Sequence, residues 1–291
     1  MGGRERFSVV SADGTRIVAE RRPGPGPAVV LVHGVAMDRR VWTDSGFLAA
    51  LPADADVIAV DLRGRGESGP GHTGEGHAPD RYTADLRAVL DHVGREDCTL
   101  VGLYFGGRVA LWTAAEDPRV ARAVSFCAHA EEVVIPVEAV EEEARAVEGP
   151  DGHAYLRENF LAKGAPAWMV EACDRVDRRE LGAATRGLLH GAERAAERGT
   201  RDQELVLVTA SGDQDLDPFL AGAKRLGARL LLLDAPTRVR AAALVTEVAR
   251  DLFPGPGADT DTDTATGTGT GTGTATRTSA GTGTVGGAGP A

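Results

Sequence analysis

Residues 98–107 read Cys-Thr-Leu-Val-Gly-Leu-Tyr-Phe-Gly-Gly, and this stretch decides the fold. The apolar run that ends at Gly102 is too short for a helix, so it is typical of a strand buried in a parallel sheet. A helical pattern follows from Gly107 to Ala115. A strand that passes directly into a helix needs a sharp turn, and the glycines at 102, 106 and 107 leave room for one around Tyr104.

The same alternation of short apolar runs and helical patterns continues on both sides of this turn. The other predicted strands are 28–32, 57–60, 123–127, 204–209 and 229–233, and the other predicted helices are 80–93 and 237–253. An N-terminal hairpin is expected from 6–11 and 16–20. Strands that alternate with helices indicate an α/β fold with a doubly wound, mostly parallel sheet, whose ligand sites lie at the carboxyl ends of the strands.

Two segments depart from this alternation. Residues 131–202 are helical and charged, and we expect a cap inserted between two parts of the core, residues 1–130 and 203–253; an ordinary run of surface helices is the alternative. The apolar residues of this segment form two stripes: Val137, Val140, Ala144 and Val147, then Met169, Cys173 and Val176. Residues 254–291 are mainly Thr, Gly and Ala, which bury too little apolar surface to offset the entropy of ordering, so a disordered tail is expected.

Composition excludes several classes of function. The 291 residues carry a formal charge of −11 and no Lys/Arg-rich run, so nucleic acid is not an expected partner. Cys98, Cys127 and Cys173 lie far apart without the spacing of a metal or redox site, and we interpret them as packing residues. No leader and no apolar run of about 18 residues is present, so we expect a soluble cytoplasmic protein with no membrane contact.

Three loops at the ends of predicted strands carry a linked signature. His33-Gly34 follows the first, Asp61-Leu-Arg-Gly-Arg-Gly-Glu-Ser68 follows the second, and Gly102-Leu-Tyr-Phe-Gly-Gly107 follows the third. In this order the loops resemble those of the α/β-hydrolase superfamily, in the cap-bearing branch that includes haloperoxidases, epoxide hydrolases and C–C bond hydrolases. The resemblance covers about residues 7–253. It implies the α/β-hydrolase fold. It also implies that the Asp61–Ser68 motif mostly fixes the geometry of its own loop and is not catalytic.

The resemblance also defines a catalytic triad from which this chain departs. Tyr104 stands where the superfamily has its nucleophilic serine. Gly212-Asp-Gln-Asp215 is similar to the acid loop, so Asp215 is the counterpart of the acid, with Asp213 and Asp217 as rivals. No histidine follows His190, so the base of the triad is missing. A Ser-His-Asp relay needs that imidazole, and ordinary serine hydrolysis is therefore not expected.

Other parts of the site survive the loss of serine and histidine. The resemblance implies an oxyanion hole made by the backbone N–H groups of Val35 and Phe105, and backbone donors do not depend on side chains. His129 follows a predicted strand and is a candidate proton carrier or a plain strand-end residue. His33 is expected to brace its loop. Three apolar residues of the cap are expected either to line an apolar pocket or to pack between the cap helices: Phe160, Trp168 and Met169.

Three hypotheses about function remain. The first is a cofactor-independent enzyme of secondary metabolism, of lyase, isomerase or cyclase type, that acts on an apolar carbonyl compound with Tyr104 as proton donor or hydrogen-bond anchor. The second is a catalytically inactive binding protein. The third is a hydrolase that activates water through Asp215 or His129. A Tyr104 whose hydroxyl faces an open cavity favours chemistry, whereas a Tyr104 buried against cap side chains favours a plug. We expect an apolar small molecule as ligand, without cofactor or metal, and the sequence does not define the oligomeric state.

Overall fold

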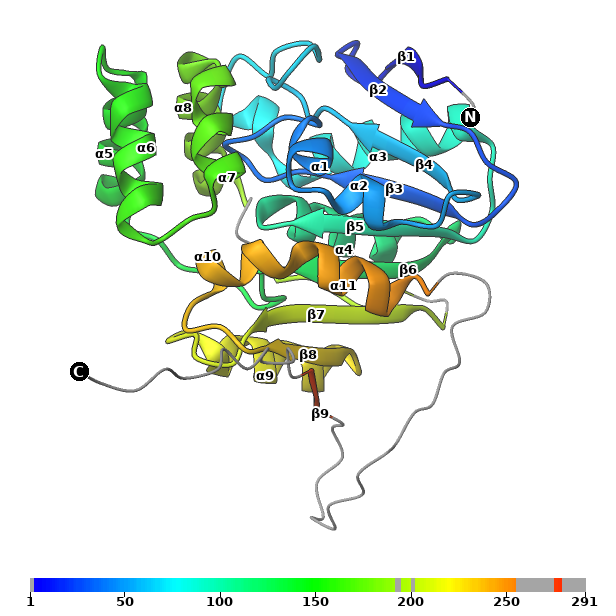
Figure 1. Cartoon of the computed structure of the whole chain (residues 1–291). Helices are drawn as coiled ribbons and strands as arrows, with labels where there is room; N and C mark the ends of the chain where they lie inside the picture. The colour runs from blue at the N-terminus through cyan, green and yellow to red at the C-terminus, as the bar shows by residue number, and fades with distance from the viewer. Residues whose placement is uncertain (1–2, 192–194, 200–201, 255–274, 279–291) are drawn as a thin grey trace, which may run out of the picture.

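The protein is described by a computed structural model that covers residues 3–191, 195–199, 202–254 and 275–278. Its strands form one sheet in the order β1-β2-β4-β3-β5-β6-β7-β8-β9 (Figure 1). The strands are β1 (Glu5–Val10), β2 (Arg16–Arg22), β3 (Ala28–Val32), β4 (Asp56–Val60), β5 (Cys98–Leu103), β6 (Val120–Phe126), β7 (Glu204–Ala210), β8 (Arg229–Leu233) and β9 (Ala275–Thr278). The β1–β2 and β2–β4 pairs are antiparallel and the other pairs are parallel, which confirms the predicted α/β fold.

Helices cover both faces of the sheet (Figure 1). The core helices are α1 (Val41–Asp44), α2 (Phe47–Ala50), α3 (Pro79–Val93), α4 (Phe105–Glu116), α9 (Leu216–Leu226), α10 (Arg238–Ala241) and α11 (Val245–Leu252), with the 3-10 turns η1 (Glu75–His77) and η4 (Ala242–Leu244). Side chains of β3 alternate between the two faces: Val30 and Val32 pack with α3, α4 and α9, while Val29 and Leu31 pack with α1, α2 and α11. This period of two places a buried layer on each side of β3.

The chain between β6 and β7 forms a helical segment that lies beside the sheet (Figure 1). We call it the cap, and its elements are α5 (Val137–Glu148), α6 (Gly152–Ala162), α7 (Ala167–Ala172), η2 (Cys173–Arg175), α8 (Arg178–Arg186) and η3 (Gly187–His190). Ion pairs tie it to the core, because Arg175 lies 3.1 Å from Asp38 and 2.9 Å from Asp44. On the other side, Glu180 of α8 accepts a hydrogen bond of 2.8 Å from the backbone N–H of Gly71.

Three sequence expectations differ from the structure. Val137 is 55% exposed because it is the first residue of α5, whereas Val140, Ala144 and Val147 are buried as predicted. The single helix predicted over 237–253 is instead α10, η4 and α11, since a 3-10 turn interrupts it at Ala242–Leu244. Within the predicted tail, Ala275–Thr278 forms β9 parallel to β8. Threonine favours strands, and the edge of β8 offers backbone groups to pair with. The remainder of that tail beyond residue 254 lies outside the described residues.

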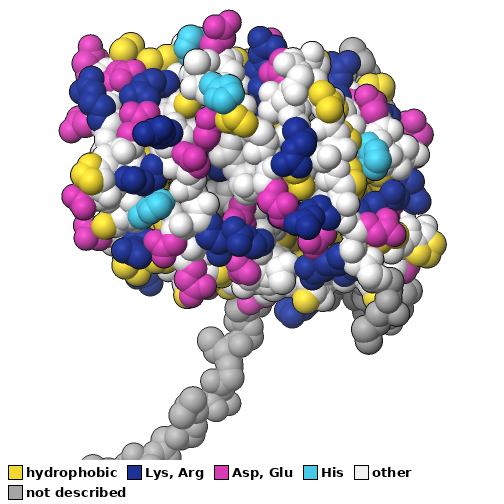
Figure 2. Space-filling view, turned by 90° about the horizontal axis from the view of Figure 1, so that it is seen from above, with side chains coloured by type: hydrophobic (Ala, Val, Ile, Leu, Met, Phe, Trp, Pro, Cys, Tyr) yellow, Lys and Arg dark blue, Asp and Glu magenta, His cyan; other side chains and the backbone are white. Residues whose placement is uncertain are grey.

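The surface charge and the helix lengths can be compared with what binding to nucleic acid or spanning a membrane requires. On the face seen in Figure 2, basic and acidic side chains are interleaved, without a broad area of one sign. Within the described ranges, no helix combines the length and the apolar character that crossing a bilayer requires.

The turn from β5 to α4 is the most constrained part of the backbone. Tyr104 has φ 51° and ψ −121°, a left-handed region that a bulky residue seldom occupies. Its N–H donates to Phe126 O at 2.7 Å, and its own carbonyl accepts from Gly107 N at 2.7 Å. A Cβ on Gly106 would lie 2.2 Å from Val32 O, so only glycine lets α4 start this close to β3.

Replacing Gly106 by alanine should therefore destabilise the fold, although alanine is the better helix former. The added Cβ meets the carbonyl oxygens of Val32 and His33, at 2.2 and 2.5 Å, and backbone atoms cannot rotate aside. We expect a loss of about 3 kcal/mol or more in the free energy of unfolding, measured by urea denaturation. Gly3→Ala is the control, because no atom lies within 4 Å of its Cβ. Equal urea midpoints for the two variants would contradict this account of the turn.

Candidate functional site

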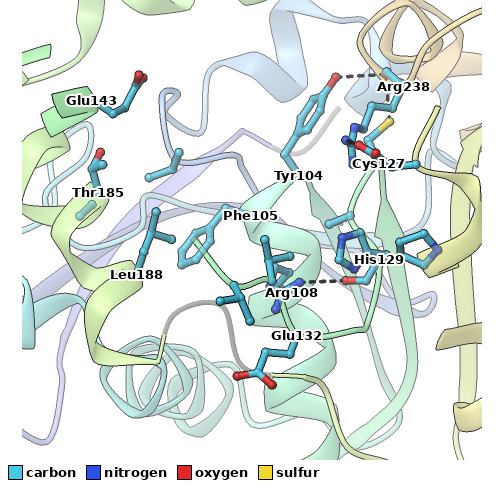
Figure 3. Close-up of a pocket in the computed structure, with 17 residues that line it drawn as sticks. Tyr104, Phe105, Arg108, Cys127, His129, Glu132, Glu143, Thr185, Leu188 and Arg238 are labelled. Atoms are coloured by element: carbon cyan, nitrogen blue, oxygen red, sulfur yellow. Dashed lines mark hydrogen bonds and ion pairs between the residues drawn. The ribbon is translucent and has the colours of Figure 1, made fainter. Parts of the chain in front are cut away.

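A cavity of about 670 Å³ opens between the cap and the loops that follow β5, β6 and β7 (Figure 3). This volume is within the usual range of small-molecule sites, about 300–1,000 Å³. Tyr104, Cys127 and His129 line its core side, and Glu143, Thr185 and Leu188 line its cap side (Figure 3). The cavity therefore lies where ligands bind in sheets of this topology.

Tyr104 forms part of the cavity wall, but its proton is already engaged. The phenol donates to the carbonyl oxygen of Arg238 at 3.1 Å (Figure 3). Burial, together with the neighbouring Cys127 thiol, raises the pKa of Tyr104 well above its usual value. The phenol is therefore neutral at physiological pH, and its hydroxyl anchors the Arg238 backbone.

Cys127 is a second donor to the same carbonyl, and sequence reasoning missed it. Its Sγ lies 3.1 Å from Arg238 O, and its backbone has φ 64° just after β6. Burial raises the pKa of this thiol well above its usual value, so it is not a ready nucleophile. Cys127 was interpreted from the sequence as a packing residue. Its position at the end of a strand, two residues before His129, was the available signal.

Arg238 lies in the segment that follows β8, where the superfamily places its base histidine. Its backbone N–H donates to Asp213 at 2.9 Å, and its guanidinium forms an ion pair with Asp215. Asp213 is buried and also accepts the N–H of Asp215, at 2.9 Å, whereas Asp217 is exposed on α9. Asp215, the predicted counterpart of the triad acid, thus forms an ion pair with an arginine and not with a histidine. A guanidinium stays protonated in proteins, so this pair cannot act as a base.

His129 lines the cavity on the loop after β6. Arg108 fixes this loop by donating to the carbonyl oxygens of His129 and Glu131, at 3.2 and 3.0 Å (Figure 3). The imidazole packs edge-on against Phe219, and its Nδ1 is buried with no hydrogen-bond partner in the described part of the chain. Burial, then the charges of Arg108 and Arg238, lower the pKa of His129. A hydrogen bond with the Glu131 backbone opposes this shift in part. A neutral imidazole can accept a proton.

The loop after β3 is held from behind by His33, as expected from the sequence. Leu62 N donates to His33 Nε2 at 3.0 Å, so Nδ1 carries the proton that it shares with Gly34 O at 2.7 Å. In a trans peptide the C=O and the N–H point in opposite directions, so Val35 N–H is directed away from the His33 ring. Phe105 N–H lies at the first turn of α4, where N–H groups are free of intrahelical bonds. Val35 and Phe105 both line the cavity.

The remaining candidates are structural. Asp61 accepts the N–H groups of Arg39 and Glu67, and Ser68 donates back to Asp61 O, so this motif fixes its loop. Met169 is fully buried, and Phe160 and Trp168 pack beside the core. Phe160 lines a smaller cavity of about 200 Å³ inside the cap, and neither Met169 nor Trp168 lines the main cavity. Within the described residues no group of His, Cys, Asp and Glu is arranged to hold a metal ion.

The chain is similar to several known proteins. Residues 27–168 match the family described as "alpha/beta hydrolase fold". A non-heme haloperoxidase of Rhodococcus erythropolis is 38% identical over 118 residues, which are 40% of this chain and 42% of that protein. A putative 2-succinyl-6-hydroxy-2,4-cyclohexadiene-1-carboxylate synthase of Bacillus subtilis is 31% identical over 104 residues, 35% of this chain and 37% of that protein. The matches thus span less than half the length of these relatives.

Solved structures extend the similarity to nearly the whole chain. The bottromycin epimerase BotH, solved in complex with bottromycin A2, is 65% identical with a TM-score of 0.84, over 86% of this chain and 98% of that chain. Epoxide hydrolase A from Mycobacterium thermoresistibile is 21% identical with a TM-score of 0.64, over 86% and 97%, and shows the fold alone. The sequence resemblance is confirmed, and the chain belongs to the α/β-hydrolase superfamily, in its cap-bearing branch.

Proposed function

We propose that this protein is an epimerase that removes and returns a proton at a carbon next to a carbonyl group of a bottromycin-type compound. The observation that carries the proposal is a cavity lined by Val35, Phe105, Tyr104 and Arg238, at the positions where we expect the oxyanion hole, the nucleophile and the base of a serine hydrolase. The 65% identity to the bottromycin epimerase BotH supports both the reaction class and the ligand.

The reaction needs a base and a site for negative charge. His129 takes the proton from carbon, and the electron pair of the C–H bond moves onto the carbonyl oxygen to form an enolate. The N–H groups of Val35 and Phe105 stabilise that oxygen, and such donors contribute about 2.7–4 kcal/mol each. Water in the open cavity returns a proton to the opposite face, and His129 releases its proton to the hydroxide that remains. Neither a covalent intermediate nor a net change in mass results.

Tyr104 has a passive part in this scheme. Its hydroxyl holds the carbonyl of Arg238, and its raised pKa makes it a weak proton donor. Acyl transfer needs a nucleophile and a base, and in this scheme the Tyr104 ring and the Arg238–Asp215 ion pair take up the positions of these two groups. The hydrogen-bond anchor is thus favoured over the proton donor.

A binding protein without catalysis is the second candidate. It is favoured by one observation, namely that the Tyr104 hydroxyl is already bonded within the protein. Tyr104 nevertheless lines the cavity of about 670 Å³ without filling it, so the ring leaves room for a ligand.

Substituting His129 by asparagine should slow epimerisation of bottromycin A2 by about 10²–10⁴-fold, because an amide cannot accept the proton. Conversion of one purified epimer into the other, followed by chromatography, is the assay. Since the neutral imidazole is the active form and its pKa is lowered, wild-type kcat/KM should be constant near neutral pH and fall only below the ordinary histidine range. This acid limb should be missing in the variant.

Tyr104→Phe is the matched control for that experiment. It keeps the ring and leaves Cys127 as the remaining side-chain donor to Arg238 O, so turnover should fall by less than about tenfold, the equivalent of one neutral hydrogen bond. Full activity of His129→Asn combined with loss of activity in Tyr104→Phe would transfer the proton-carrying role to Tyr104. Tight binding of bottromycin A2 without conversion by the wild type would favour the binding protein.

Serine-directed phosphonylating reagents should not label this protein. The turn after β5 presents a phenol of raised pKa, whose hydroxyl is bonded to the carbonyl oxygen of Arg238 and not to a base. Intact-protein mass spectrometry after prolonged incubation should show the unmodified mass, while an ordinary serine esterase in the same tube is labelled. Stoichiometric labelling that maps to a serine would reveal a relocated nucleophile and restore the hydrolase hypothesis.

A further inference from the structure

Arg65 is a buried cation behind the loop that carries Val35. It lies in the turn after β4, between Gly64 and Gly66, both of which have positive φ, and only 3% of its surface is exposed. Burying a charge is costly unless a partner of opposite charge compensates it. The partners of Arg65 are therefore informative.

These partners are neutral. The guanidinium donates from Nε to Val35 O and from Nη1 to Gly64 O, the latter at 2.8 Å. Its Nη2 is buried with no acceptor, and no carboxylate lies within ion-pair distance among the residues that the structure describes. Arg63, two residues earlier, is equally buried but forms ion pairs with Asp85 at 2.6 Å and Asp13 at 2.8 Å. The contrast indicates that Arg65 keeps a charge that no contact neutralises.

The ionisable groups around Arg65 do not pair with it directly. Burial lowers the pKa of His33 and of His77 and raises that of Tyr82, so all three are neutral at physiological pH. Glu180 and Asp177 of the cap act on Arg65 only through space. The Glu180 carboxylate already accepts hydrogen bonds from Gly71 N at 2.8 Å and from His77 Nε2 at 3.4 Å. Burial lowers the pKa of Arg65, and the charges of Glu180 and Asp177 oppose that shift in part. A guanidinium stays protonated even so, which leaves a buried cation behind Val35.

We propose that Arg65 is the charged positioning residue of an oxyanion subsite, which selects ligands that carry a delocalised negative oxygen, such as an enolate or a phenolate. Its bond to Val35 O fixes the residue whose N–H would meet that oxygen. Its charge stabilises the developing anion through a medium in which electrostatic interactions are stronger than in water. This role rests on the proposed function only for the identity of the natural ligand.

The test uses 4-nitrophenol, which becomes a coloured phenolate, so that binding is measured apart from epimerisation. The wild type should bind the phenolate in preference to the neutral phenol and so lower the apparent pKa of the bound probe. Arg65→Lys keeps the charge and a donor, Arg65→Gln keeps only a donor, and Arg65→Met keeps neither. We expect the lysine variant to retain most of the shift, and the other two to lose at least about one pKa unit, a tenfold loss of preference. Binding of the neutral phenol should change little across the series.

A matched control removes a cation from the opposite end of the sheet. Arg122 lies near the start of β6 and donates to Leu252 O at 3.0 Å, so Arg122→Gln should leave the probe pKa unchanged. Equal probe pKa values in the wild type and the Arg65→Gln variant would overturn the proposal. Equal losses of the probe pKa shift in the Arg65→Lys and Arg65→Gln variants would also overturn it, because Arg65 would then act only as a structural support. Failure of the phenolate to bind the wild type would overturn it as well. A variant of Arg65 that loses this shift yet epimerises at full rate would separate the subsite from the proposed function.

Discussion

The site depends on one constraint, the left-handed backbone of Tyr104 between β5 and α4. A strained residue persists only where its surroundings determine it fully. Here the hydrogen bonds from Tyr104 N to Phe126 O and from Gly107 N to Tyr104 O hold the turn, and Gly106 lets the start of α4 touch the end of β3. The same geometry brings Phe105 N–H and Val35 to one side of the cavity. The turn therefore fixes the position of Phe105 N–H at the first turn of α4.

Three side chains around this turn are linked to one another. The phenol of Tyr104 and the thiol of Cys127 both donate to Arg238 O, while the guanidinium of Arg238 is paired with Asp215. An arginine cannot carry a proton back and forth, so these residues stabilise the wall of the cavity. Only the His129 imidazole combines a lowered pKa, a place in the cavity and an unpartnered nitrogen, within the part of the chain described here. In the proposed reaction the base therefore lies on the loop after β6.

The fold could be predicted from the sequence because short buried strands, helical periodicity and three strand-end motifs all agree. The loss of serine was readable from Tyr104 alone, and the bracing of the loop by His33 was anticipated. The partner of Asp215 was not anticipated, because the absence of histidine drew attention away from Arg238, whose charge was visible in the same segment. Cys127 was missed although it ends a predicted strand two residues before His129. The burial of Arg65 without a carboxylate partner could not be predicted, because missing partners are not encoded in a residue pattern. The strand Ala275–Thr278 was missed because its pairing is set by the edge of β8.

In the proposed reaction the cavity exchanges a proton on carbon without cleaving a bond to oxygen or nitrogen. The most direct measurement is the mass spectrum of bottromycin A2 after incubation with the protein, in parallel in heavy water and in water labelled with heavy oxygen. Our account predicts the gain of one deuterium at a single carbon, at a rate that matches epimerisation, and no uptake of labelled oxygen. Uptake of labelled oxygen together with cleavage of the compound would identify a hydrolase and contradict the account, as would binding of the compound with neither label incorporated.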